Sequence, residues 1–298
     1  MDIIKAIASE LNVRNNQVEA AVKLIDEGCT IPFISRYRKE ATGALNDEQL
    51  RNLDERLKYL RNLEDKKTQV IASIAEQGLL TDELKNQIEK ADTMVAVEDL
   101  YRPYRPKRRT RATIAKEKGL EPLANVILLQ MTGEPVVKTA EEYVSEEKDV
   151  KTPEDAVAGA KDIIAESISD NADYRTRIRE LTFKEGVLTS AAKDAEAKTV
   201  YEMYYNFSEP AAKMAGHRIL AVNRGENEKI LTVKIEAPVD KILSYLEKQI
   251  IVRDNRYTTG IIKEAIEDSY ERLIAPSIER EIRNQLTETA EAGAIKVF

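Results

Sequence analysis

The sequence has no tryptophan, one cysteine and one histidine among its 298 residues. A single cysteine, Cys29, excludes an internal disulfide bond and a cysteine-based zinc site. Because His217 is the only histidine, a two-histidine metal site or a catalytic relay would have to be built around it. No run approaches the roughly 18 apolar residues of a membrane span, and the first residues lack the pattern of a signal peptide. We therefore expect a cytoplasmic protein without a membrane segment.

Glycine, proline and phenylalanine are also scarce, at 11, 9 and 4 residues, whereas 42% of the chain is apolar and 33% is charged. This balance is apolar enough to fold and rich in helix-forming residues. We predict a mainly α, multi-helical protein. The formal net charge is -7, so any contact with nucleic acid must come from a local basic patch.

Residues 1–45 are predicted to form three short helices. Apolar stripes over 3–11 and 18–25 indicate the first two, and Gly28 ends the second. Thr30 is the expected N-cap of the third. This succession resembles a helix-turn-helix arrangement, and a generic helical bundle is the alternative.

The most regular segment spans residues 47–78. Leucines recur from Leu50 to Leu60 at alternating spacings of three and four, which predicts one long amphipathic helix. Lys67 falls at a core position of this pattern. We therefore expect the helix to act as a packing strut and not as a sustained coiled coil.

The rest of the chain is predicted to be helical with one β-hairpin. Thr152 and Pro153 give a strong helix start, with a capping hydroxyl and a proline in the first turn. A β-prone run at 218–223 and an alternating run at 231–236 flank a turn at 224–227, which predicts the hairpin. The expected helices are 82–91, 111–118, 121–130, 153–169, 239–250, 258–274 and 276–293.

Two regions are expected, a helical region over 1–192 and a region of β-hairpin and helices over 193–298. The chain closes with the apolar run 294–298. A solvated chain end usually carries polar residues, so we expect this end to be a cut at a domain boundary.

A basic segment over 101–111 has six cations and no acid. Its prolines prevent helix formation, so its cations can follow a phosphate backbone while its tyrosines offer faces for base stacking. Alternatively, Arg102, Arg105 and Arg108 pair with acids such as Glu98 and Asp99, and both tyrosines pack. The candidate nucleic-acid-binding residues are Tyr101, Arg102, Tyr104, Arg105, Lys107, Arg108, Arg109 and Arg111.

A second candidate basic cluster consists of Arg36, Arg38 and Lys39, at the end of the third short helix. Cations there also complement the negative end of a helix dipole, which is the alternative. For catalysis, we expect His217 to be structural and Cys29 to pack as a small apolar residue. The sequence has no phosphate-cradling glycine-rich loop and no GxSxG elbow. We therefore expect no enzymatic activity, metal or cofactor.

Several motifs, read together, closely resemble the Tex family of bacterial transcription accessory proteins. They are IPFISRYRKEATG at 31–43, EDLYRPYRPKRRTRA at 98–112, NFSEP at 206–210, HR at 217–218 and APSIERE at 275–281. They span nearly the whole chain in the family's order.

The resemblance implies a cytoplasmic, RNA-binding transcription accessory protein that shares its core architecture with a eukaryotic elongation factor. It also implies later domains that the 298 residues do not include: a ribonuclease-H-like domain generally regarded as non-catalytic, a helix-hairpin-helix domain and an OB-fold domain that binds RNA. Expected partners are RNA or single-stranded nucleic acid, bound weakly by this part, RNA polymerase or a transcription complex, and those later domains. The alternative is a protein-docking module for RNA polymerase that binds no nucleic acid itself.

Overall fold

The computed structural model describes residues 2–295, and its chain divides into two compact units, one ending at Tyr104 and the other beginning at Arg105. The protein is mainly α-helical, as predicted, with one small sheet. No described helix is long and apolar enough to cross a membrane. The expected division at 192/193 differs from this one, and residues 296–298 of the apolar chain end lie outside the described residues.

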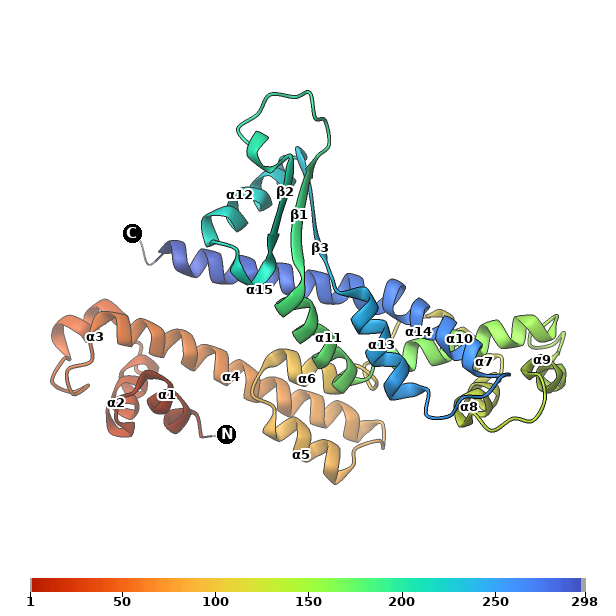
Figure 1. Cartoon of the computed structure of the whole chain (residues 1–298). Helices are drawn as coiled ribbons and strands as arrows, with labels where there is room; N and C mark the ends of the chain where they lie inside the picture. Colours follow the sequence, from red (N-terminus) through yellow and green to blue (C-terminus); the bar gives the residue numbers. More distant parts are fainter. Residues whose placement is uncertain (1, 296–298) are drawn as a thin grey trace. The chain divides into compact units, whose positions relative to one another are not determined.

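The first unit is built from helices alone (Figure 1). The three short helices predicted within residues 1–45 are present, and Thr30 is the N-cap of the third. Their likeness to a helix-turn-helix motif stays a prediction. The helices are α1 (Ile3–Leu11), α2 (Asn15–Asp26), α3 (Ile31–Tyr37), α4 (Asp47–Glu76), α5 (Asp82–Lys90) and α6 (Met94–Tyr101).

Helix α4 is the predicted long helix and supplies the central apolar stripe of this unit. Asn46 and Gln49 begin it with reciprocal hydrogen bonds of 2.7 and 3.0 Å between side chain and backbone. Lys67 interrupts the stripe at 2% exposure. Its ammonium donates to Glu64 Oε1 and to the carbonyl of Glu89, both at 2.9 Å, so the buried charge joins α4 to the end of α5.

The second unit combines helices with a three-stranded antiparallel sheet (Figure 1). The strands are β1 (Val187–Ala192), β2 (Asn206–Pro210) and β3 (Leu231–Glu236). The helices are α7 (Arg111–Glu117), α8 (Glu121–Leu129), α9 (Val136–Ala140), α10 (Pro153–Ser169), α11 (Ala172–Glu185), α12 (Gly216–Asn227), α13 (Val239–Ile250), α14 (Thr259–Asp268) and α15 (Ala275–Ile295).

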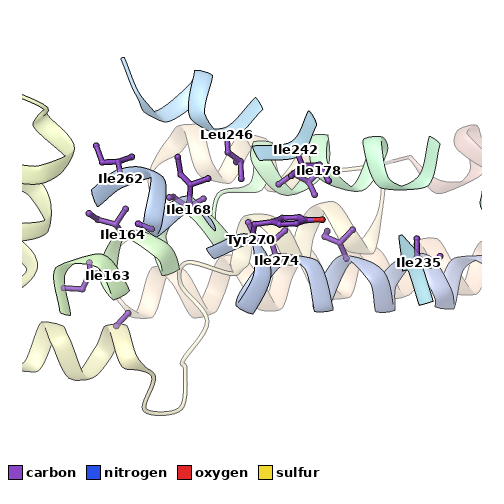
Figure 2. Packing of buried hydrophobic residues seen from close by; sticks show 14 of the residues in the cluster. Ile163, Ile164, Ile168, Ile178, Ile235, Ile242, Leu246, Ile262, Tyr270 and Ile274 are labelled. Carbon is purple, nitrogen blue, oxygen red and sulfur yellow. The ribbon is translucent and has the colours of Figure 1, made fainter. Parts of the chain in front are cut away.

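Helix α10 has the bounds that its sequence predicts, because its start is fixed locally. The Thr152 hydroxyl accepts from the backbone of Asp155, and the Asp155 carboxylate accepts from the backbone of Thr152. Its apolar face then enters the core of the unit, where Ile164 and Ile168 belong to the same apolar cluster as Tyr270 (Figure 2).

The predicted β-hairpin over 218–236 is wrong in its first half. Residues 218–223 lie within helix α12, and β3 pairs with β1, as in Leu188↔Ile235. The β-branched residues Ile219 and Val222 of α12 are buried on one helical face. Tertiary packing therefore overrides local strand propensity.

Two glycines explain how closely α12 packs. A Cβ on Gly216 would lie 3.2 Å from Ala290 Cα of α15, and one on Gly225 would lie 2.6 Å from Leu231 of β3. The missing side chains let α12 approach both neighbours closely.

Pro276 is predicted to begin a separate helix, but the chain is helical without a break from Thr259 to Ile295. Residues 269–274 form a π-helical turn that joins α14 to α15. Proline lacks an amide hydrogen and clashes with the carbonyl four residues earlier in a regular α-helix, and a wider turn before it relieves that conflict. Tyr270 and Ile274 from this turn enter the core beside Ile178 (Figure 2).

A buried ion pair joins α11 to α15. Arg175 is 0% exposed, and its guanidinium donates to Ser277 Oγ at 2.6 Å and to Glu281 Oε1 at 3.0 Å. Arg179 donates to the other oxygen of Glu281 at 2.7 Å. Burial alone raises the pKa of Glu281, but the hydrogen bond from Arg179 and the charges of both arginines outweigh it and hold the pKa below its ordinary value.

The Glu281→Gln variant is expected to lower the free energy of unfolding by about 2 to 3 kcal/mol at neutral pH, because it removes a carboxylate that accepts from a buried guanidinium. Urea denaturation measures this loss. Glu288→Gln, an exposed acid on the same helix, is the matched control and should have no comparable effect.

The same pair predicts a pH dependence. Folding lowers the pKa of Glu281. The contribution of the ion pair to stability is therefore complete above the pKa of the carboxyl in the unfolded chain, about 4.5. It is lost as the pH falls through the lower pKa of the folded protein. The stability gap between wild type and Glu281→Gln should therefore narrow below about pH 4.5. A gap that stays constant down to pH 3 would contradict a charged Glu281 in the folded protein.

Candidate nucleic-acid interface

Both tyrosines of the basic segment pack within the first unit. The Tyr101 hydroxyl lies 3.0 Å from Ser73 Oγ, and Lys66 Nζ lies 5.9 Å from the centre of its ring. Tyr104 packs against the apolar core, and its carbonyl accepts from Gln77 Nε2 at 2.9 Å. These rings contribute to the fold of the unit, as the packing alternative expects.

The cations of the same segment differ in their surroundings. Lys107 is about three-quarters buried and lies between two acids of the second unit, Glu166 at 3.3 Å and Asp170, to which it donates. Arg109 meets Glu117 at 3.3 Å with both side chains exposed. Within residues 2–295, Arg108 is exposed and makes no hydrogen bond or ion pair.

Arg102 and Arg105 also interact with other residues of the chain. Lys107 is therefore an anchor of the segment, whereas Arg108 and Arg109 extend toward solvent.

Arg111, the first residue of α7, faces acids of the second unit. Burial raises the pKa of Asp162, and the charges of Arg272 and Arg111 oppose that rise. A hydrogen bond from Arg272 lowers the pKa of Asp268, against its burial, and Arg111 acts in the same direction. The charge of Arg111 is thus partly balanced by these acids of its own unit.

The cluster of Arg36, Arg38 and Lys39 lies at the end of α3, where all three side chains are exposed. None of them makes an ion pair with any acid in the described part of the chain. They line an open concavity of about 560 Å³, together with Tyr37, Ala41, Ala44 and one acid, Glu40. We call residues 36–44 the basic turn.

The basic turn is held by hydrogen bonds at its base. Gln17 Nε2 of α2 donates to the carbonyl of Gly43 at 2.7 Å, and the Ala44 amide donates to the carbonyl of Lys39 at 2.8 Å. The buried Thr42 hydroxyl donates to the same carbonyl. Ala44 keeps a φ of 68°, a conformation that a residue with a Cβ adopts only when its surroundings hold it there.

The structure exposes two aromatic rings that the sequence interpretation assigned only to the third helix. Ile34 is fully buried, but Phe33 is 40% exposed and Tyr37 is 71% exposed. Their ring centroids are 5.3 Å apart. The spacing of 33 and 37 puts both rings on one helical face. The cations that flank Tyr37 were the available signal that this face meets solvent.

His217 and Cys29, the two candidates for catalysis, lie in different units. His217 is exposed in the first turn of α12, and Cys29 is partly buried against the apolar core of the first unit. In the stretch from residue 2 to 295, no three metal-binding side chains gather.

The structure thus defines a helical protein that bears a basic turn held by hydrogen bonds. Its sequence matches the Tex-like protein N-terminal domain over residues 1–75 and the Tex central region-like family over residues 132–298. The chain belongs to the Tex family.

Related proteins extend well beyond this chain. YdcI of Bacillus subtilis is 52% identical over 98% of the chain and 41% of its own length. The transcriptional accessory protein Tex of Neisseria gonorrhoeae is 39% identical over 100% of the chain and 40% of its own length. S1 RNA-binding domain-containing protein 1 of Homo sapiens is 29% identical over 100% of the chain and 31% of its own length. The chain therefore spans about two fifths of the bacterial relatives that it matches.

Lys107→Ala is expected to loosen the segment around it, because it removes the anchor to Glu166 and Asp170. Trypsin should then cleave after Arg108 and Arg109 several-fold faster, since proteolysis follows local opening. Mass spectrometry of timed digests locates the cuts. Lys116→Ala breaks an exposed pair of 3.6 Å and serves as the control. Equal cleavage rates in all three proteins would show that Lys107 does not anchor the segment.

Proposed function

We propose that this chain is the helical part of a non-enzymatic, cytoplasmic, RNA-associated transcription accessory protein, and that its basic turn contacts phosphates. The observation that carries the proposal is the set of three exposed cations, Arg36, Arg38 and Lys39, without ion-pair partners in residues 2–295 on a turn fixed by backbone hydrogen bonds. Arg108 and Arg109 add two further exposed cations.

Unpaired cations favour this role because a phosphate can replace their counterions without first breaking an internal ion pair. The fixed turn also means that little ordering accompanies binding. Lys107, Tyr101 and Tyr104 are weaker candidates for binding nucleic acid, since their contacts lie within the protein. The names of the relatives, which mention transcription and an S1 RNA-binding domain, agree with an RNA-associated protein.

Replacing Arg36, Arg38 and Lys39 by alanine is expected to weaken binding of labelled single-stranded RNA at low salt. Three phosphate contacts correspond to a slope of about -2 in a plot of log affinity against log salt, and the variant should flatten that slope. Fluorescence anisotropy across a salt series measures both quantities.

The matched control replaces Lys5, Lys23 and Lys90 by alanine, which removes the same charge from exposed positions of the same unit. It should bind almost as the wild type does. Equal losses in both variants would mean that net charge, and not the basic turn, determines binding. An Arg108→Ala, Arg109→Ala variant reports on the basic segment without disturbing Lys107.

Docking to another protein is the second candidate function, and an exposed apolar surface of the second unit favours it. Leu129, Met131 and Val252 are 64%, 65% and 72% exposed. The buried Gln130 side chain accepts from the amides of residues 252 and 253, each at 3.1 Å, and so joins the two backbone segments that carry them.

The exposed arginines Arg253 and Arg256 lie in the same loop. We infer that the fitting partner is a protein surface with an apolar centre and an acidic rim, such as one on RNA polymerase.

Changing Leu129, Met131 and Val252 to serine is expected to weaken binding to purified bacterial RNA polymerase by at least tenfold, as loss of apolar anchors does. Biolayer interferometry measures the affinity. The control changes Val200 and Met203, which are 86% and 71% exposed in another loop of the same unit, to serine. If neither variant alters a measurable interaction, the surface is not the polymerase contact.

A further inference from the structure

Tyr37 is an exposed aromatic ring within the basic turn. It is 71% exposed, and its neighbours in sequence, Arg36 and Arg38, are cations. Within the described residues its one ring contact is with Phe33, at 5.3 Å and an interplanar angle of 43°. No cation lies over the ring among residues 2–295, so a face of it is open to a ligand.

Phe33 and the turn fix where this ring lies. Phe33 is one helical turn before Tyr37, and only 40% of its side chain is exposed, so it supports the tyrosine from one side. The bond from Gln17 to the carbonyl of Gly43 and the bond from Ala44 to that of Lys39 hold the cations beside it. Ring and cations therefore share one preformed concavity.

We propose that Tyr37 is a base-stacking platform and that the basic turn binds single-stranded nucleic acid, with Arg36, Arg38 and Lys39 on the phosphates that flank the stacked base. This inference rests on the phosphate contact proposed above and names the ligand class. An aromatic ring beside cations is the arrangement by which proteins bind unpaired strands without sequence preference. Bases in a duplex stack on one another and do not offer a face to an exposed ring.

This placement differs from the one that the sequence indicated. Tyr101 and Tyr104 were the expected stacking residues, yet Tyr101 bonds Ser73 and Tyr104 packs against the core. Tyr37 combines an open ring with unpaired cations.

The test uses Tyr37→Ala, Tyr37→Phe and Tyr37→Trp. Because Tyr37 is mostly exposed, Tyr37→Ala is expected to fold as the wild type does, which circular dichroism checks. Anisotropy is measured with labelled strands of about twelve nucleotides, enough to cover one stacking site. The strands are RNA, DNA of the same sequence, an RNA duplex and an abasic strand.

Tyr37→Ala should bind single-stranded RNA about tenfold more weakly, the loss of one base stack, and bind the duplex and the abasic strand as the wild type does. Tyr37→Phe should retain affinity, since it keeps the ring. The sequence has no tryptophan, so Tyr37→Trp supplies a single tryptophan, which can be excited at wavelengths that tyrosine does not absorb. Stacking bases should quench its fluorescence, and an abasic strand should not. The DNA strand shows whether the site distinguishes the two sugars.

Three outcomes overturn the stacking proposal. If Tyr37→Ala binds RNA as the wild type does and Tyr37→Trp is not quenched, the ring does not stack, although salt-sensitive binding lost in the Arg36, Arg38 and Lys39 variant would still support the phosphate contact. If Tyr37→Ala instead weakens binding to purified RNA polymerase and leaves RNA affinity unchanged, Tyr37 belongs to a protein contact. Absence of any RNA binding by the wild type would end both proposals.

Discussion

In each unit, a buried cation joins two helices. A positive charge removed from water is costly unless carboxylates and carbonyls surround it. Lys67 meets this requirement by joining α4 to the end of α5, and Arg175 meets it by joining α11 to α15. In each case an acceptor lies far along the chain, on the second helix. The hydrogen bond therefore specifies the register between the two helices, which apolar packing specifies less sharply.

The same principle separates the surface cations into two kinds. Lys107 is enclosed by Glu166 and Asp170, and the charge of Arg111 acts on two acids of its own unit. Arg36, Arg38 and Lys39 have no such partners within residues 2–295. A short basic cluster whose charges face only solvent is therefore a better guide to a nucleic-acid contact than a dense basic run with internal partners. The family match alone does not distinguish these two kinds of cluster.

Much of the fold follows from local sequence signals. The capping pair of Thr152 and Asp155 and the leucine spacing of α4 act over a few residues, and both helices were predicted closely. The hairpin was wrong because the helical state of 218–223 depends on contact with α15, more than sixty residues away. The candidate cations could be read from composition, but their pairing could not, since Asp170 lies 63 residues from Lys107. The exposure of Tyr37 depends likewise on which face of α3 is buried.

The π-helical turn over 269–274 sets the rotational phase of everything that follows it. Each residue advances a helix by about 100°, so a chain shorter by one residue in this turn would rotate α15 by that angle. Glu281 would then turn away from Arg175, and the faces that meet α12 and β3 would turn with it. A single insertion or deletion within these six residues of one continuous helix would therefore alter three interfaces at once.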